Sequence, residues 1–188
     1  MILPRKESME KREYKMAELQ TMERSSEELL SGEWNDEILD RMEKVIAAEA
    51  PIRRSLLYKR VINSFALQKL GSRLLPLFDS ISASLANPVS EDRDGESVFH
   101  KEMDESYFRP TPDSRVRYSY QIPHAEAASA LLYILSSSDK ASWTRSELYS
   151  AFLSVMLWEK SGRAIEELYC HALLDPRIRR SGNGRILK

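Results

Sequence analysis

An internal repeat constrains the fold of this chain more than any other feature. Residues 37–101 and residues 124–187 each read as a helix, a short extended step, a helix, a tight turn, a helix and a short strand pair. The match is clearest at the tight turn, where residues 67–73 correspond to residues 157–163, and it continues with Phe78 opposite Leu168. Such self-similarity means that one supersecondary unit is built twice. The sequence therefore predicts two copies of a small three-helix module with a β wing.

Apolar residues recur at helical spacing in both halves. In the first half they predict helices before Pro51, over 55–64 and after Gly71, and Asp94-Gly95 predicts the hairpin turn of the wing. In the second half they predict helices after Pro123, after Ser142 or Thr144, and over 162–174, with a wing over 177–187. The predicted fold class is mainly α with small β wings, namely tandem winged-helix (helix-turn-helix) modules preceded by an N-terminal helix.

The predicted domains are an N-terminal helical extension over 1–34, a first winged-helix module over 35–101, a connector over 102–123 and a second module over 124–188. Within the extension, a thin apolar stripe of Met9, Met16, Leu19 and Met22 favours a helix over 7–30, with Ser25 and Glu28 forming a capping box. This helix either packs on the body or docks on a partner or a second copy. In the connector, residues 115–122 alternate in the manner of a strand.

Composition indicates an ordinary globular protein. The net charge is −1, the charged fraction is 30%, and Cys170 is the single cysteine, so no internal disulfide can form. We interpret Cys170 as a buried structural thiol. No apolar run reaches the roughly 18 residues that a membrane helix needs, and the N-terminus becomes charged at Arg5, unlike a signal peptide. We expect a cytoplasmic protein with no membrane contact.

The charge pattern carries more information than the total. Residues 50–78 contain basic but no acidic residues, residues 87–106 are mostly acidic, and the chain is basic again after Asp175. Basic clusters of this kind are typical of contact with a phosphate backbone. The candidate nucleic-acid-binding residues are Arg53, Arg54, Lys59, Arg60, Arg73, Arg177, Arg179, Arg180 and Arg185. The alternative is that these side chains are solubilising charges or pair with the acidic segments.

No motif points to catalysis. The sequence lacks a glycine-rich phosphate loop and a Cys/His cluster with zinc spacing, and its three histidines are scattered. The adjacent acids Glu166 and Glu167 fall on a face that we expect to be solvated. We therefore predict no enzyme, no catalytic residue, no metal and no cofactor.

Several short motifs resemble a known family. Residues 49–52, the pair Arg60-Val61, residues 65–67 and residues 71–73 resemble the uncharacterised winged-helix-like C-terminal domain of very large bacterial superfamily-one helicase and endonuclease-like proteins. Ile122-Pro123, with Glu126 and Ala130 downstream, resembles the start of the second half of that domain. The similarity covers roughly residues 37–187. It implies a context of nucleic-acid processing or defence and no specific activity.

Two functions are compatible with these observations. In the first, the protein is an accessory that grips DNA or RNA without sequence preference for a helicase or nuclease. The predicted reading helices offer little for base recognition, because Arg73 stands nearly alone in the first and Glu166 and Glu167 lie in the second. In the second, the modules are protein-interaction or dimerisation units, with the N-terminal helix as the contact of a homo-oligomer. Divergent surfaces predict that the two copies do different jobs.

Overall fold

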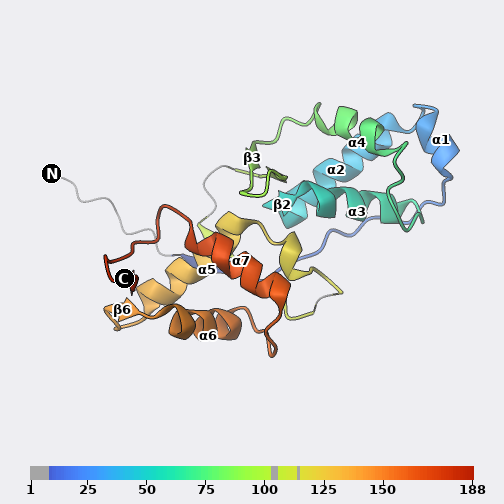
Figure 1. The fold of residues 1–188 in the computed structure, drawn as a ribbon. Helices are drawn as coiled ribbons and strands as arrows, with labels where there is room; N and C mark the ends of the chain where they lie inside the picture. Colours follow the sequence, from blue (N-terminus) through green and yellow to red (C-terminus); the bar gives the residue numbers. More distant parts are fainter. Residues whose placement is uncertain (1–8, 103–105, 114) are drawn as a thin grey trace. The chain divides into compact units, whose positions relative to one another are not determined.

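The computed structural model describes residues 9–102, 106–113 and 115–188 (Figure 1). The chain divides into two compact units, which we call the first unit (residues 15–103) and the second unit (residues 1–14 with 104–188). Both combine helices with short strands, so the predicted class of mainly α structure with small β elements is confirmed. Among the described residues, no helix has the length and apolar character that crossing a membrane requires.

In its described residues, 15–102, the first unit contains four helices and one small sheet. The helices are α1 (Ser26–Leu30), α2 (Asn35–Glu49), α3 (Arg54–Ser64) and α4 (Leu75–Ser82), and the strands are β2 (Ile52–Arg53), β3 (Val89–Glu91) and β4 (Ser97–Phe99). The strands form an antiparallel sheet in the order β2-β4-β3. Gly95 has φ of 82° at the tip of the β3–β4 hairpin, which is the turn predicted from Asp94-Gly95.

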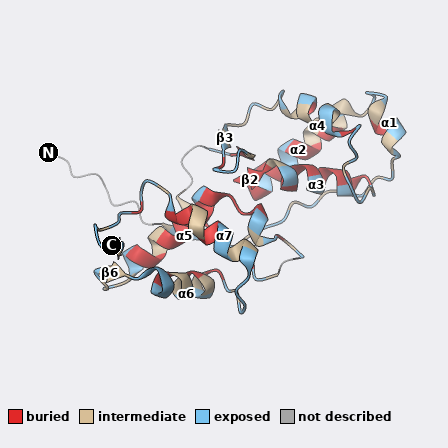
Figure 2. Cartoon of the chain, in the orientation of Figure 1, coloured by how far each residue is buried: buried red, intermediate tan, exposed pale blue. Residues whose placement is uncertain are grey.

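The core of the first unit forms where α2, α3 and α4 face one another, and Figure 2 shows the buried faces of these helices. Met42 and Val45 of α2, Val61 of α3 and Phe78 of α4 are fully buried. Pro76 occupies the first turn of α4, where the lack of an N–H costs least. The helical spacing in the sequence therefore identified the correct core faces.

The segment before α1 was predicted to be helical, and the structure shows that it is not. Of the predicted helix over 7–30, residues 7 and 8 lie outside the described residues, residues 12–25 have no helical structure, and only α1 is helical. The Ser25–Glu28 capping box is present and opens α1. Residues 15–25 instead run along the core of the first unit, where Met22 donates its backbone N–H to Ser64 and Arg24 donates to Phe65. These long-range backbone bonds outweigh the local helical preference of the segment.

The second unit repeats part of this succession, because its last five elements again follow the order helix, strand, helix, helix and strand. It contains β1 (Glu10–Lys11), β5 (Tyr107–Phe108), a 3₁₀ turn η1 (Ser119–Gln121), α5 (His124–Ser137), β6 (Ser142–Trp143), α6 (Arg145–Val155), α7 (Arg163–Leu173) and β7 (Ile186–Leu187). β6 pairs antiparallel with β7, and a single bridge joins Arg180 to Ile186 across the predicted turn. Thr144 caps α6 through a capping box with Glu147. β1 adds a parallel strand to β5.

The strand predicted over 115–122 is absent. Residues 115–116 form a turn and η1 follows, with Gln121 folding back to accept the backbone N–H of Tyr118 at 2.9 Å. The alternation of Val116, Tyr118 and Tyr120 therefore reflects a bent segment. Tyr118 and Tyr120 stack on each other and are 41% and 54% exposed.

The backbone geometry of the tight turn shifts the correspondence between the two repeats by one residue from the correspondence that the sequence suggested. Ala66 and Leu157 share a positive φ, at 61° and 62°, and they follow α3 and α6 respectively. The carbonyl oxygens of Gly71 and Gly162 each accept the N–H groups three and four residues later. Both pairs are 91 positions apart, so Gly71 corresponds to Gly162 and Phe78 to Tyr169. The sequence match aligned Leu67 with Leu157, whereas the turn geometry aligns Ala66 with Leu157.

Candidate nucleic-acid interface

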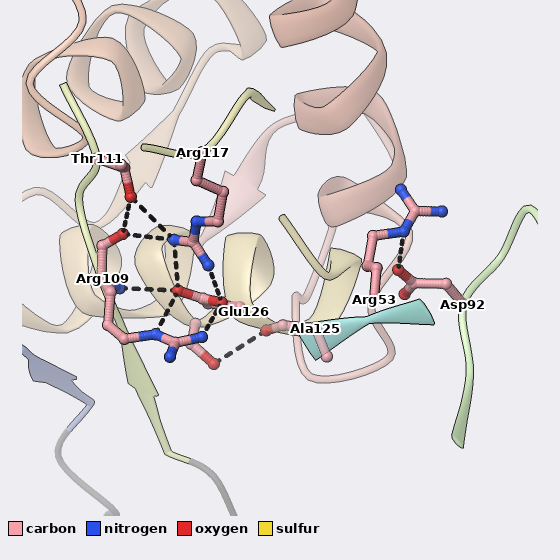
Figure 3. A network of polar contacts seen from close by, with 8 residues as sticks. Arg53, Asp92, Arg109, Thr111, Arg117, Ala125 and Glu126 are labelled. Atoms are coloured by element: carbon pink, nitrogen blue, oxygen red, sulfur yellow. Dashed lines mark hydrogen bonds and ion pairs between the residues drawn. The ribbon is translucent and has the colours of Figure 1, made fainter. Parts of the chain in front are cut away.

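Arg53 lies inside the first unit and not on its surface. The side chain is 4% exposed and forms an ion pair with Asp92 at 3.5 Å (Figure 3). It also forms ion pairs with Asp94 and, at 2.9 Å, with Glu96. All three acids belong to the β3–β4 hairpin or its tip. The negative charge that the sequence places on this wing is therefore largely directed at one buried guanidinium, and Arg53 acts as the anchor of the wing.

Arg60 is also committed to the structure. Its Nε donates to both carboxylate oxygens of Glu49, at 3.1 and 3.0 Å, and Glu49 is completely buried. The same carboxylate accepts the backbone N–H of Ala17 at 3.0 Å. This arrangement joins α2, α3 and the N-terminal segment. Removing either partner of such a pair leaves a buried charge unpaired, at a cost of about 3–5 kcal/mol.

The other three candidates of the first unit are nearer the surface. Arg54 pairs with Asp79 at 3.2 Å, and Arg73 pairs with Glu27 at 2.6 Å with both side chains 70% exposed. Lys59 is exposed on α3. Exposed pairs contribute little to stability and can be exchanged for a phosphate. These residues can reach a ligand, but they share their surface with carboxylates.

The C-terminal wing of the second unit has a different character. Residues 176–188 contain five basic residues and no acidic one. Arg179 and Arg180 are exposed, and each uses one guanidinium nitrogen to bond a backbone carbonyl, of Lys188 and Leu173 respectively. Arg185 donates to Ser142 Oγ at 2.8 Å, and Arg177 pairs with Asp175 at 2.9 Å. A guanidinium has five N–H groups, so these carbonyl contacts orient the side chains and leave donors for a ligand.

The helices α4 and α7, which are the third helices of the two repeats, offer little for base reading among their exposed residues. On α4 the exposed residues are Leu75, Pro76 and Ser80, all uncharged. On α7, Arg163 is exposed but pairs with Glu167 at 2.8 Å, and Glu166 is exposed beside it. Both acids lie on the solvated face, as the sequence predicted. A phosphate approaching α7 would meet these carboxylates.

A buried polar network in the second unit was not predicted. Glu126 on α5 is completely buried and binds the guanidinium groups of Arg109 and Arg117 at 2.8 and 2.9 Å (Figure 3). Burial by itself would raise the pKa of Glu126, but the charges of the two arginines lower it to about 2. The ring of Tyr14 lies 4.2 Å from Arg117 and 5.0 Å from Arg109. From the sequence, Glu126 was noted only as part of a family resemblance. Its burial could not be predicted, because charged residues are rarely buried.

The cysteine and two of the histidines also differ from what the sequence predicted. Cys170 is half-buried and not a core residue, and it lies in a pocket of about 410 Å³ with its sulfur 2.7 Å from Arg145 Nη2. His124 and His171, far apart in the sequence, meet with ring nitrogens 2.9 Å apart where α5 and α7 pack together. Neither contact could be anticipated from spacing, because each joins side chains of two different helices, 25 and 47 positions apart in the sequence.

Comparison with known proteins gives one match. Residues 27–75 match the family described as "Protein of unknown function (DUF3320)", which spans α1, α2, β2, α3 and the first residue of α4. This segment is therefore similar to an uncharacterised domain. No curated protein matches the chain, and no solved structure matches it.

Proposed function

We propose that this chain is a non-enzymatic pair of winged-helix modules that holds DNA or RNA by its phosphate backbone, as an accessory to a helicase or nuclease in bacterial nucleic-acid processing or defence. The order of helix, strand, helix, helix and wing in each unit supports the winged-helix assignment. The resemblance of residues 37–187 to a helicase-associated domain supports the context. The family match over residues 27–75 is compatible with it and adds no activity.

The observation that carries the proposal is the basic C-terminal wing. Arg179 and Arg180 are exposed and oriented by carbonyl contacts, and no acidic residue occurs between Pro176 and Lys188. Phosphate binding needs positive charge and imposes no demand on base-edge geometry. The third helices, in contrast, offer uncharged or acidic surfaces. Binding through the wing is therefore independent of sequence.

Fluorescence anisotropy with a labelled 20-nucleotide single strand and a 20-base-pair duplex tests this proposal. If about four phosphates are contacted, the logarithm of the affinity falls with the logarithm of the salt concentration at a slope of roughly −4. The triple variant Arg177→Gln, Arg179→Gln, Arg180→Gln is expected to weaken binding at least tenfold at 50 mM salt and to reduce the slope by about three.

The matched control removes exposed arginines elsewhere in the same unit. Arg115→Gln with Arg163→Gln changes charge on a turn and on α7, where both side chains are about nine-tenths exposed. This variant is expected to bind nearly as the unmodified protein does. If it loses as much affinity as the wing variant, or if the unmodified protein does not bind at 50 mM salt, the proposal fails.

A protein-interaction role is the alternative, and one observation favours it. Leu75 on α4 and Val89 on β3 are large apolar side chains of the first unit that are 41% and 51% exposed. Dimerisation through the N-terminal segment is less well supported than in the sequence prediction, since Leu19 and Met22 pack on the core of their own unit. Size-exclusion chromatography with light scattering distinguishes a monomer from a homo-oligomer.

A further inference from the structure

The first unit has a groove whose lining differs from that of the basic wing. Its volume is about 710 Å³, and it lies among α3, the turn after α3, the start of α4 and the tip of the β3–β4 hairpin. Ile62, Leu70 and Leu75 contribute apolar side chains to it. Leu75 is 41% exposed, although it belongs to a helix whose other leucine is partly buried. A large exposed leucine beside a groove is a feature of binding surfaces.

Charged groups surround this apolar lining unevenly. Lys59 on α3 and Lys69 on the turn are exposed. Asp94 and Glu96 come from the hairpin tip, but both carboxylates are paired with Arg53. Glu96 also accepts the backbone N–H of Ser55, the second residue of α3, at 2.7 Å. Among the residues that line the groove, three basic side chains, Arg54, Lys59 and Lys69, therefore outnumber these two acids.

The second unit contains an equivalent pocket with different chemistry. Arg54, Ser55 and Tyr58 line the groove of the first unit, and Arg145, Ser146 and Tyr149, each 91 positions later, line the 410 Å³ pocket of the second. The position of Leu75, however, is taken by Glu166, and that of Lys59 by Ser150. The framework is duplicated, whereas the apolar and basic character belongs to the first unit.

We propose that the groove of the first unit binds a segment of a partner protein that carries one large aliphatic or aromatic side chain flanked by Asp or Glu. The apolar anchor would contact Leu75, Leu70 and Ile62, and the flanking carboxylates would face Lys59 and Lys69. A peptide suits this surface, because the apolar lining of Ile62, Leu70 and Leu75 offers contacts to an aliphatic or aromatic side chain. The proposal concerns a surface other than the wing and does not depend on nucleic-acid binding.

A phage library of random 12-residue peptides, selected on the full chain, tests the proposal. Enriched peptides are expected to share an aliphatic or aromatic residue with at least two acidic neighbours. Synthetic peptides from the selection should bind Leu75→Glu at least tenfold more weakly than the unmodified protein. Lys59→Gln with Lys69→Gln, both at exposed positions, should also weaken binding and flatten its dependence on salt.

The control is the equivalent position of the second unit, where Glu166→Gln is expected to leave peptide affinity unchanged. Thermal unfolding of Leu75→Glu checks that loss of binding is not loss of fold. The proposal is overturned if no peptide is enriched, if the enriched peptides are basic, or if Leu75→Glu binds normally. It is equally overturned if a 20-nucleotide single strand displaces the selected peptides, since the groove would then hold phosphates.

Discussion

Glu126 holds two arginines inside the second unit, and its environment makes stability depend on pH. The carboxylate accepts two guanidinium groups and the backbone N–H of Arg109. Its pKa is lowered from 4.5 to about 2 by these charges, although burial opposes the shift. A lowered pKa in the folded state means that the charged form is favoured by folding. The stabilisation is therefore complete above about pH 4.5 and is lost as the pH falls toward 2.

We predict that Glu126→Gln removes this dependence. The variant leaves two buried guanidinium groups without a counter-charge, so the free energy of unfolding at pH 7 should fall by about 3–5 kcal/mol. Urea denaturation at several pH values measures the effect. Between pH 4.5 and 2 the unmodified protein should lose about 3 kcal/mol more than the variant does. Equal slopes in that window would show that Glu126 does not titrate with folding.

Leu157 is a second residue with a specific effect on stability, which it exerts through its backbone conformation. Its φ of 62° places it in the left-handed region, where a side chain costs about 1–2 kcal/mol. The N–H of Trp158 bonds back to the carbonyl of Leu153 at 2.9 Å, which is the hydrogen bond of a Schellman cap. Glycine is the residue that such a position favours, and Leu157 is 49% exposed, so little packing would be lost.

We therefore predict that Leu157→Gly stabilises the second unit by about 0.5–1 kcal/mol, after the greater chain entropy of glycine is subtracted. Tryptophan fluorescence in a Trp34→Phe background reports the second unit, because Trp143 and Trp158 both belong to it. Ser154→Gly, at an exposed position inside α6, is the control and should destabilise the unit. A destabilised Leu157→Gly would contradict the strain assigned to this turn.

At the scale of elements, the N-terminal segment shows where sequence patterns mislead. Met16, Leu19 and Met22 fit a helical stripe and also fit an extended segment that contacts a core at intervals. In the structure, Leu19 and Met22 pack on the first core, whereas Met16 is 51% exposed. A helix would have used all three. Periodicity over so few apolar residues cannot separate the two conformations, because the deciding bonds are made to Ser64 and Phe65, far along the chain.

This difference gives a direct test. Met22→Ala should lower the stability of the first unit by about 1–2 kcal/mol, since a partly buried methionine is removed from the core surface. Met16→Ala should change stability by no more than about 0.5 kcal/mol. Chemical denaturation followed by the fluorescence of Trp34, in a background that carries Trp143→Phe and Trp158→Phe, measures both. Comparable losses from the two variants would instead support the helical stripe.

The helices of the two modules were predictable, because each buries a face of regularly spaced apolar residues such as Met42 and Val45 in α2. The chemical roles of charged residues were not. Arg53 and Arg60 looked like surface cations, yet they pair with acids of another element at Asp92 and Glu49. Spacing reports which face of a helix is apolar, but only tertiary structure decides which charges meet. The candidate interface is accordingly smaller than the sequence indicated.

Considered as a whole, the molecule repeats one framework with two surfaces. The turn geometry at Ala66 and Leu157 is shared, and so are the arginines that begin α3 and α6. The third-helix position that is Leu75 in one unit is Glu166 in the other, and the acidic wing of the first unit has a basic counterpart in the second. Duplication preserved the core and changed the exposed positions. Two different ligands, one for each unit, are the expected consequence.

The last prediction is that these two binding activities can be removed separately. In the full chain, the triple wing variant at Arg177, Arg179 and Arg180 should lose oligonucleotide binding and keep the affinity for selected peptides. Leu75→Glu should lose peptide binding and keep the affinity and salt slope for the oligonucleotide. Anisotropy with the two labelled ligands measures all four affinities under one set of conditions. If either variant lost both activities while remaining folded, the two surfaces would form a single interface, and the functional divergence of the units would be wrong.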